Sequence, residues 1–378
     1  MIKNKRAIML VALMVLATNA LTNKMLACTD VVLHKTKGIV VSGRTLDFTI
    51  ELGGDIIAKK SGTLVEDKFI HLVNTKTFNT KLANTELGHT QTVNSKSLPF
   101  SWTSKYNVLL VGICNTACYP EGLNSQGLSV STLWHNGSEP AQIVQPGTRA
   151  ISVPAITEYI LENAKTVDET KMLMDAFSIF PLFDPKHQLK VQNHWIVTDK
   201  TGRSVVIELK NGKPKFFEQA SQINVLTNQP CYDEQLTHLA KFSYLKAKNN
   251  KNDVIAGCIV NGSGALGMPG DYTPASRFVK TAFLAKYVAP LKSGQDGINT
   301  VFHILHNVDI PRGAIAEGDY TQWTSARDHQ NLTFWFASYN HPAIKFIDLN
   351  KIDFDKVAGR HMSIDYDGNG DVTAQFMQ

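Results

Sequence analysis

Apolar and polar residues alternate along much of the chain with the two-residue period of β-strands. The clearest stretch is DVVLHKTKGIVVSGRTLDF at 30–48, which predicts two strands joined by a Lys-Thr-Lys-Gly turn, the first beginning almost at Cys28. The further strands expected are 106–113 and 127–133 with turns at Gly122 and Gly127, strands within 195–219 joined by Lys-Thr-Gly and Asn-Gly turns, INVLT at 223–227, and 319–325, 332–339 and 344–349.

Helical periodicity predicts helices near 154–178, 232–247, 275–289 and 296–307. Pro154 suits a helix start, and Thr166 and Glu169 have the spacing of a capping box. Strands and helices thus follow each other in groups along the chain. This order predicts an α+β or layered α/β fold with mostly antiparallel pairing. Because the chain shows no repeat, low-complexity tract or linker, residues 28–378 are expected to form one domain.

The first 27 residues differ in character from the rest. A basic start is followed by an almost unbroken apolar run, Ala7 to Ala17, which is shorter than the roughly 20 residues that span a bilayer. We therefore predict a signal peptide, residues 1–27, that is removed on maturation, and a periplasmic or secreted protein. The leader carries four lysines and arginines and no acid, so it accounts for most of the formal net charge of +5. The near-neutral remainder argues against a nucleic-acid partner.

Two short motifs suggest ligands but have better explanations as loops. Gly262-Ser-Gly-Ala-Leu-Gly267 matches the dinucleotide fingerprint, yet Met-Pro-Gly follows where a helix should open. Asp365-Tyr-Asp-Gly-Asn-Gly370 resembles the start of a calcium loop, but Phe376 stands where the twelfth-position acid is required. We expect an irregular glycine loop, a polar turn and no cofactor.

The remaining cysteines and histidines give weaker signals. Disulfides among Cys114, Cys118, Cys231 and Cys258 are an open question in an exported protein. Cys114 and Cys118 could form half a zinc site, but no partner motif accompanies them, so no metal is expected. A papain-like site would need a histidine such as His194, His303 or His306, and none has a local signature. We expect His194 to be a core or strand-end residue and the other two to be surface or half-buried residues of a helix.

Cys28 lies where the leader ends and the strand pattern begins. Met25-Leu-Ala-Cys28 partly matches a lipidation signal, so one hypothesis is a non-catalytic lipoprotein or binding module that is anchored to a membrane through Cys28. Polar residues 22–24 interrupt that signal, and a strand rather than a flexible tether follows the cysteine. An ordinary core thiol is the second hypothesis.

The third hypothesis makes Cys28 an N-terminal nucleophile. Cleavage before Cys28 would give one residue both a thiol and an α-amine, whose reference pKa of about 8 suits it to accept the thiol proton. Arg44 and Asp47 lie on the return strand of the predicted hairpin, where a cation would favour the thiolate and an acid could orient the amine. Signal peptidase could instead cut after Ala20, with 21–27 removed autocatalytically.

Five ordered segments make the chain resemble the choloylglycine hydrolase family, which contains conjugated bile salt hydrolases and penicillin V acylases. These segments are Cys28-Thr-Asp, Gly43-Arg44-Thr-Leu-Asp47, Thr227-Asn228-Gln-Pro230, Gly267-Met-Pro-Gly-Asp271-Tyr-Thr-Pro-Ala-Ser-Arg277 and Thr321-Gln-Trp-Thr-Ser325. The resemblance runs from Cys28 to about residue 350. It implies an N-terminal-nucleophile hydrolase with a four-layer αββα sandwich, acting on linear amides without a metal or organic cofactor. Many relatives are tetramers, so a homotetramer is a further expectation.

The resemblance also implies roles for individual residues. Cys28 would be the nucleophile with its α-amine as base, Arg44 would lie beside the thiol, and Asp47 would bind the amine. Asn228 would donate its side-chain N–H to the oxyanion, Arg277 would support Asn228, and a second oxyanion donor would be a backbone N–H near Trp134. From the pattern alone, Thr-Asn-Gln-Pro reads as a turn and Arg277 as a surface charge on a helix.

Trp134 is where the chain departs from the pattern. Bile salt hydrolases tend to carry Asn at this position and many penicillin V acylases Tyr. A tryptophan provides a large apolar wall with one N–H. It favours flat aromatic or long acyl groups and resembles the Gram-negative penicillin V acylase branch, where N-acyl homoserine lactones are also cleaved. The alternative is that Trp134 is a core residue.

Overall fold

Two large β-sheets dominate the computed structural model, which describes residues 27–69, 100–141, 149–184, 189–218, 224–316, 318–357 and 359–378. The leader, residues 1–26, lies outside the described residues. The first sheet has the order β16-β1-β2-β19-β20-β21-β23. Its strands are β1 (Cys28–Thr36), β2 (Ile39–Phe48), β16 (Val225–Leu226), β19 (Tyr320–Asp328), β20 (Thr333–Ser338), β21 (Lys345–Asp348) and β23 (Gly370–Asp371).

The second sheet has the order β15-β14-β13-β8-β7-β6-β3-β22. Its strands are β3 (Asp55–Lys59), β6 (Val108–Ile113), β7 (Cys118–Asn124), β8 (Ser129–Trp134), β13 (Asn193–Thr198), β14 (Ser204–Lys210), β15 (Lys213–Glu218) and β22 (His361–Ser363). Short two-stranded pairs are formed by β4 (Leu64–Glu66) with β5 (Ser101–Thr103), β9 (Arg149–Ser152) with β10 (Phe177–Phe180), β11 (Leu182–Asp184) with β12 (Leu189–Val191), and β17 (Val254–Ile255) with β18 (Cys258–Ile259).

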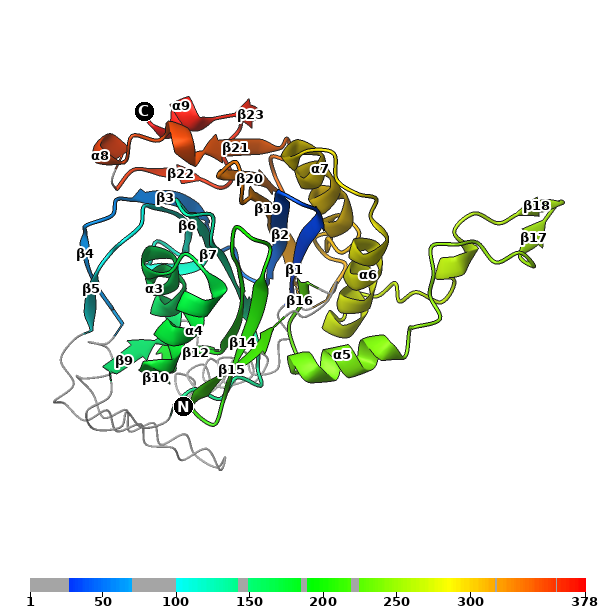
Figure 1. The fold of residues 1–378 in the computed structure, drawn as a ribbon, viewed down its shortest axis with the longest axis horizontal. Helices are drawn as coiled ribbons and strands as arrows, with labels where there is room; N and C mark the ends of the chain where they lie inside the picture. Colours follow the sequence, from blue (N-terminus) through cyan, green and yellow to red (C-terminus); the bar gives the residue numbers. More distant parts are fainter. Residues whose placement is uncertain are drawn as a thin grey trace, which may run out of the picture.

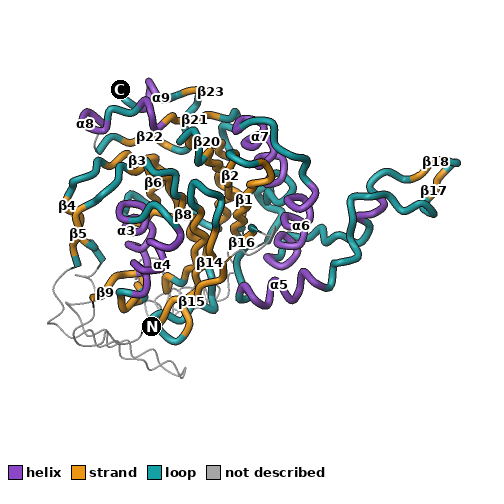
Figure 2. Tube along the Cα trace, in the orientation of Figure 1, coloured by secondary structure: helices purple, strands orange, loops and turns teal. Residues whose placement is uncertain are grey.

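Helices cover the outer faces of both sheets, which gives the expected α+β, four-layer αββα sandwich (Figures 1 and 2). The helices of the described residues are α3 (Ile156–Asn163), α4 (Val167–Asp175), α5 (Tyr232–Ala240), α6 (Pro274–Tyr287), α7 (Gly294–Leu305), α8 (Phe354–Val357) and α9 (Thr373–Phe376). Helices α6 and α7 pack on β1 and β2 of the first sheet, and α3 packs on β7 and β8 of the second. Buried apolar residues from both sheets, such as Leu46 and Leu123, belong to one core cluster.

The strand and turn predictions are largely confirmed. Strands β1 and β2 form the hairpin expected after Cys28, and the chain between 193 and 218 forms the meander β13-β14-β15. Asn211 and Gly212 have φ angles of 51° and 76° between the paired residues Lys210 and Lys213. Positive φ at both central residues is the mark of a tight type I′ hairpin turn, which Asn-Gly favours.

Gly122 is a correction, because it lies inside β7 and not in a turn. A Cβ at this position would stand 2.7 Å from Leu161 Cδ1 on α3 and 2.6 Å from the Leu109 carbonyl oxygen. The glycine therefore allows α3 to approach the sheet closely, a packing requirement that the sequence pattern did not reveal. Gly127, with a φ of 80°, does occupy the predicted turn.

The helix predicted near 154–178 is in fact two helices followed by a strand. A 3₁₀ turn containing Pro154 leads into α3, and α4 ends before β10 begins at Phe177. Thr166 is the N-cap of α4, as predicted: its hydroxyl accepts a hydrogen bond from the Glu169 N–H at 3.1 Å. Glu169 in turn accepts from the N–H of Lys165, one residue before the cap.

Replacing Thr166 with Ala is expected to lower the free energy of unfolding by about 1 kcal/mol, because the N–H of Glu169 loses its acceptor at the start of α4. Urea unfolding followed by circular dichroism measures this difference. Thr166→Ser, which keeps the hydroxyl, is the matched control and should unfold close to the wild-type midpoint. Equal stability of the alanine and serine variants would contradict the capping assignment.

Helix α5 ends at Ala240, earlier than the 247 predicted, and a long excursion follows before α6. Strands β17 and β18 form a small hairpin at the end of this arm, which projects away from the sandwich (Figure 1). Its Val254, Ile255 and Ile259 side chains are at least half exposed. Residues 262–267 lie in the arm as a 3₁₀ turn and a loop, and no helix opens at Gly267, as predicted for an irregular glycine loop.

The polar segment 365–369 is also confirmed as turn and loop, and Gly370 begins the short strand β23. Asp365 accepts hydrogen bonds from the Ser338 hydroxyl and from Asn340, so its carboxylate braces the C-terminal region. Helices long and apolar enough to cross a bilayer are absent from the described ranges.

Candidate active site

Cys28 is the first residue of β1 and is almost entirely buried. Strand β1 lies between β16 and β2, so main-chain pairing on both sides fixes its position. In the structure Ala27 precedes Cys28, and the Cys28 nitrogen is therefore a peptide N–H that stands where an α-amine would be after cleavage. That N–H donates to Asn228 Oδ1 at 2.6 Å.

Arg44 on β2 holds a guanidinium against the thiol. Its Nη2 lies 3.1 Å from Cys28 Sγ, while Nη1 donates to the carbonyl oxygens of Pro120 at 3.1 Å and Thr132 at 2.7 Å. Pro120 and Thr132 belong to β7 and β8 of the opposite sheet, so Arg44 bridges the two layers. A fully buried cation anchored by carbonyl groups has little freedom to leave the sulfur.

Several effects of opposite sign act on the pKa of the Cys28 thiol. Burial raises the pKa of the Cys28 thiol above its ordinary value because it disfavours the thiolate. Arg44 provides the largest opposing effect, and Arg277 a smaller one in the same direction. The negative charge of Asp47 adds to the rise. The thiolate form of Cys28 therefore depends on the positive charge of Arg44.

Arg44→Met is expected to shift the acidic limb of the pH dependence of kcat/KM upward by at least about one unit, because an adjacent opposite charge typically changes a pKa by 1–3 units. At neutral pH the rate should fall at least about tenfold for the same reason. Arg44→Lys keeps the positive charge and should recover part of the shift. An unchanged pH profile in a folded Arg44→Met protein would show that the thiol does not depend on this cation.

Asp47 lies near the end of β2, and two threonines hold its carboxylate. Thr321 donates to Oδ1 at 2.6 Å and Thr45 donates to Oδ2 at 3.1 Å. Burial raises the pKa of Asp47 to about 7, against the opposing effect of the Arg277 charge. The Cys28 nitrogen contacts Asn228, as described above, so the pairing of Asp47 with a released α-amine stays a prediction.

Asn228 follows β16, which pairs with β1 through Val225 and Val31. This pairing brings Asn228 beside Cys28, 200 residues away in the chain. Arg277 Nη2 donates to Asn228 Oδ1 at 2.9 Å, and Asn228 Nδ2 donates to the Trp134 carbonyl oxygen at 3.0 Å. Arginine only donates and a carbonyl only accepts, so both neighbours define the same orientation of the amide. Nδ2 keeps a second N–H for another acceptor.

Arg277 is buried, which corrects the surface position that its pattern alone suggested. Its Nη1 donates to the Cys28 carbonyl oxygen at 2.5 Å and to the Thr29 hydroxyl at 2.6 Å. The guanidinium thus joins the backbone of Cys28 to the side chain of Asn228, while its role in supporting an oxyanion donor stays a prediction.

The segment Asp271-Tyr-Thr-Pro-Ala-Ser-Arg277 builds the helix start that carries this arginine. Thr273 is the N-cap of α6 and Pro274 occupies the first turn. Asp271 accepts from the N–H of Thr273 at 3.0 Å and from the hydroxyl of Ser276 at 2.7 Å. These local bonds fix where α6 begins, and therefore where Arg277 enters the core.

Trp134 is half-buried at the end of β8. Its ring meets Phe48 edge-on, with centroids 6.4 Å apart, and its Nε1 donates to Asn136 at 2.5 Å. The Trp134 carbonyl oxygen is the atom that contacts Asn228, while the oxyanion role of a backbone N–H near Trp134 stays a prediction. The two aromatic rings form an apolar wall near the end of β2 that pairs with Cys28.

Gln235 is a supporting residue that sequence reasoning missed. From α5 its Nε2 donates to the carbonyl oxygens of Asn228 at 2.5 Å and Pro230 at 2.9 Å, and its Oε1 accepts from the Thr227 hydroxyl at 2.8 Å. One buried side chain thus holds the whole Thr-Asn-Gln-Pro segment in place. A glutamine in an ordinary amphipathic helix carries no local signal of this role.

The histidines fall as expected, whereas disulfides among the other cysteines had been left open. Cys118, Cys231 and Cys258 are free thiols in the structure. His194 is buried on β13, with Nε2 2.8 Å from the Thr227 carbonyl oxygen, and His303 is exposed on α7. The structure therefore pairs Cys28 with arginine and asparagine, and not with the histidines that a papain-like site would use.

The architecture and this site define a class: the fold is that of N-terminal-nucleophile hydrolases, with a cysteine at the start of the first strand. Residues 28–363 match the family described as linear amide C-N hydrolases, choloylglycine hydrolase family. The chain belongs to this family, and it is a hydrolase of linear amides.

Two curated relatives show the breadth of the family. The chain is 30% identical over 278 residues to a bile salt hydrolase/transferase of Clostridium perfringens, an alignment that covers 69% of this chain and 82% of the relative. It is 28% identical over 291 residues to a penicillin V acylase of Pectobacterium atrosepticum, covering 71% of this chain and 73% of the relative.

Solved structures support the fold assignment. A variant of the conjugated bile acid hydrolase from Clostridium perfringens superposes with a TM-score of 0.72 at 24% identity, covering 90% of this chain and 98% of the other. The penicillin V acylase from Agrobacterium tumefaciens gives a TM-score of 0.70 at 21% identity, covering 92% and 96%. At these identities the likeness concerns the fold.

Proposed function

We propose that the protein is an exported cysteine amidase that uses Cys28 as its N-terminal nucleophile and cleaves a linear, non-peptide C–N amide bond. The observation that carries this proposal is the contact of Arg44 Nη2 with Cys28 Sγ at 3.1 Å, at the first residue of β1. A buried thiol with a fixed cation beside it is suited to nucleophilic attack.

The reaction begins after Ala27 has been removed from Cys28. The α-amine takes the thiol proton, and the thiolate attacks the substrate carbonyl carbon to form a tetrahedral oxyanion. The second N–H of Asn228 Nδ2 and a backbone N–H near Trp134 donate to that oxygen, and Asp47 orients the amine. Preorganised donors of this kind stabilise charge as it develops.

Collapse of the tetrahedral species breaks the C–N bond. The leaving amine receives the proton from the α-ammonium, and the acyl group stays on Cys28 as a thioester. A water then gives a proton to the α-amine and attacks the thioester, which releases the acid and returns the proton to sulfur. Cys28 thus supplies nucleophile and base through both steps, and the proposal needs no metal or organic cofactor.

Penicillin V, conjugated bile salts and N-acyl homoserine lactones are the candidate substrates. The names of the relatives support the first two. The third rests on the apolar wall of Trp134 and Phe48, which suits flat aromatic or long acyl groups.

A panel of these three amides, assayed by release of the amine, tests the substrate proposal. Intact-mass measurement during turnover should show a transient adduct with the mass of the acyl group, and digestion should place it on Cys28. An acyl adduct on another residue, with Cys28 unmodified during turnover, would overturn the proposed chemistry.

The competing function is a lipoprotein or binding module anchored through Cys28. Its thiol is enclosed by Arg44 and the Asp47 carbonyl oxygen, and the residue is only 5% exposed. A diacylglyceryl group attached to this sulfur would have to extend out of the enclosed site. This disfavours the lipoprotein hypothesis.

We also propose that copies of the chain assemble into a homotetramer and that the arm takes part in it. The exposed apolar residues of its hairpin, Val254, Ile255 and Ile259, are suited to burial against a second copy. Light scattering of the purified mature protein measures the assembled mass, and a monomer at micromolar concentration would contradict this assembly.

A further inference from the structure

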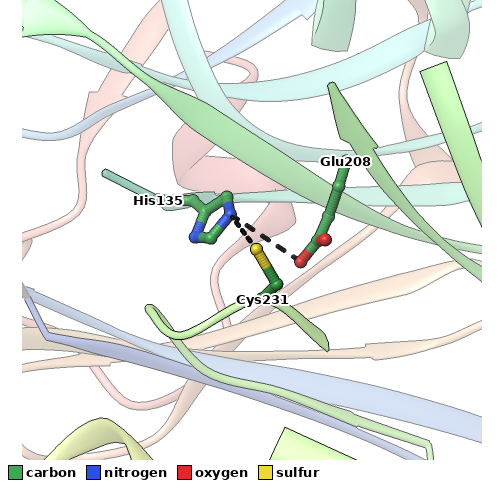
Figure 3. A group of neighbouring side chains, drawn as sticks. All are labelled: His135, Glu208 and Cys231. Atoms are coloured by element: carbon green, nitrogen blue, oxygen red, sulfur yellow. Dashed lines mark hydrogen bonds and ion pairs between the residues drawn. The ribbon is translucent and has the colours of Figure 1, made fainter. Parts of the chain in front are cut away.

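Three side chains with different ligating atoms converge beside the candidate active site without belonging to it (Figure 3). They are His135, directly after β8, Glu208 on β14, and Cys231, the residue before α5. His135 Nε2 lies 3.7 Å from Cys231 Sγ and 3.9 Å from Glu208 Oε1. All three ligating atoms lie within 4.8 Å of one another.

We propose that His135, Glu208 and Cys231 form a binding site for Zn²⁺. Zinc bonds of about 2.0–2.1 Å to nitrogen and about 2.3 Å to sulfur, in tetrahedral geometry, place neighbouring ligand atoms about 3.3–3.8 Å apart. The distance from Nε2 to Sγ already falls in this range, and the distance from Nε2 to Oε1 needs to close by about half an ångström. Three protein ligands leave the fourth position for water.

The surroundings support the ligand set. Glu208 Oε1 accepts from the Tyr232 N–H at 2.8 Å and lies 3.4 Å from His194 Nδ1. The ring of His194 stacks on that of His135, with centroids 4.6 Å apart. Bound zinc typically has ligands that are oriented by such neighbouring hydrogen bonds and packing. Cys231 is only half-buried, which gives an ion a route from solvent.

Two of the proposed ligands differ in what they must do to bind an ion: His135 is already neutral, whereas Cys231 must lose its thiol proton. Burial lowers the pKa of His135 to about 3, so the imidazole is neutral and its lone pair can bind an ion. Burial and the nearby Glu208 raise the pKa of the Cys231 thiol. On binding, the Zn–S bond forms as the S–H bond breaks, and the proton leaves to solvent.

Gly137 keeps space open at the cluster. A Cβ at this position would lie 3.0 Å from His135 Nε2 and 3.5 Å from Cys231 Sγ. The side chain of any other residue would therefore press on the His135 ring and lie in contact with the Cys231 sulfur, beside the two atoms that the ion needs. This makes Gly137→Ala a steric test that removes no ligand.

The cluster also adjoins the candidate oxyanion residues. His135 follows Trp134, whose carbonyl oxygen accepts from Asn228. Cys231 comes three residues after Asn228, and His194 Nε2 contacts the carbonyl oxygen of Thr227. Zinc would thus tie together the two chain segments that position Asn228. Zn²⁺ binding can be measured without an activity assay, so its outcome is independent of the proposed amidase activity.

Calorimetric titration of the purified, chelator-treated protein with Zn²⁺ tests the site. Cys28→Ala serves as the background, because it removes a competing thiol. We expect one Zn²⁺ per chain, and Co²⁺ in its place should give a thiolate-to-cobalt charge-transfer band. Cys231→Ser should weaken Zn²⁺ binding at least about 100-fold and abolish the band, while Cys118→Ser, the matched control, should change neither.

Two more variants keep the test independent of folding failures. Glu208→Gln retains an acceptor for the Tyr232 N–H, and Gly137→Ala retains all three ligands; each should weaken Zn²⁺ binding at least about tenfold in a protein with wild-type circular dichroism. Absence of one-to-one binding in the background protein would overturn the site. So would binding that is unchanged in Cys231→Ser, because it would place the ion elsewhere.

Discussion

Cys28→Ala is expected to abolish turnover of the best amide in the substrate panel, with a loss of at least about 10⁴-fold in kcat. The thiol is the proposed nucleophile, and no other group near it can form the thioester. Cys28→Ser should lose nearly as much, because a hydroxyl is far less acidic than a thiol and the α-amine is matched to sulfur. Single-turnover and steady-state assays on both variants measure the loss.

Two controls make this result interpretable. Cys118→Ala removes a thiol at the start of β7 whose pKa burial raises to about 12, and it should retain wild-type activity. Thermal unfolding of Cys28→Ala should remain cooperative, because alanine fills most of the space at the start of β1. A Cys28→Ala protein that hydrolyses the substrate at the wild-type rate would remove Cys28 from the mechanism.

Asn228→Asp is expected to reduce kcat by about 10²–10³-fold, the usual cost of losing one oxyanion donor. The aspartate keeps an oxygen for Arg277 Nη2 and the Cys28 N–H, but it replaces the donor Nδ2 with an acceptor. The effect should therefore fall on kcat more than on KM. Steady-state kinetics with the preferred amide provides both constants.

Asn228→Ala is expected to add a loss of stability to the loss of catalysis. It removes the donor and also leaves two buried N–H groups without an acceptor, so we expect a further loss of about 1–3 kcal/mol in the free energy of unfolding. Asn163→Ala, a buried asparagine on α3 in the opposite helical layer, is the matched control and should leave kcat unchanged. If Asn228→Asp kept wild-type kcat, the oxyanion role would be wrong.

The features predicted most accurately from the sequence are those that depend on residues close together in the chain. The β1–β2 hairpin follows from alternation and a turn within twenty residues, and it places Arg44 near Cys28 without any knowledge of the tertiary fold. The Asn-Gly turn at 211–212 and the cap at Thr166 are likewise decided by their own side chains. Features that depend on such short-range interactions can be predicted from a single sequence.

Contacts between residues far apart in the chain could not be predicted from the local pattern. Arg277 has the pattern of a surface residue on α6, and only its bonds to Cys28 and Asn228 explain its burial. Its role came from the resemblance to known amidases, as did that of Asn228. Gly122 shows the same limit for packing, because the close approach of α3 depends on a helix that begins 34 residues later. Tertiary packing, and not local propensity, decides such positions.

Intact-mass measurement of the purified mature protein tests the central claim most directly. The proposed mechanism requires a chain that begins at Cys28 with a free α-amine, so the mass should be that of the chain with everything before Cys28 removed. The same measurement on Cys28→Ala reports the cleavage route: a chain beginning at Leu21 would favour autocatalytic removal of 21–27, and one beginning at residue 28 would exclude it. A diacylglyceryl adduct on Cys28, or an active enzyme that retains Ala27, would contradict the N-terminal nucleophile.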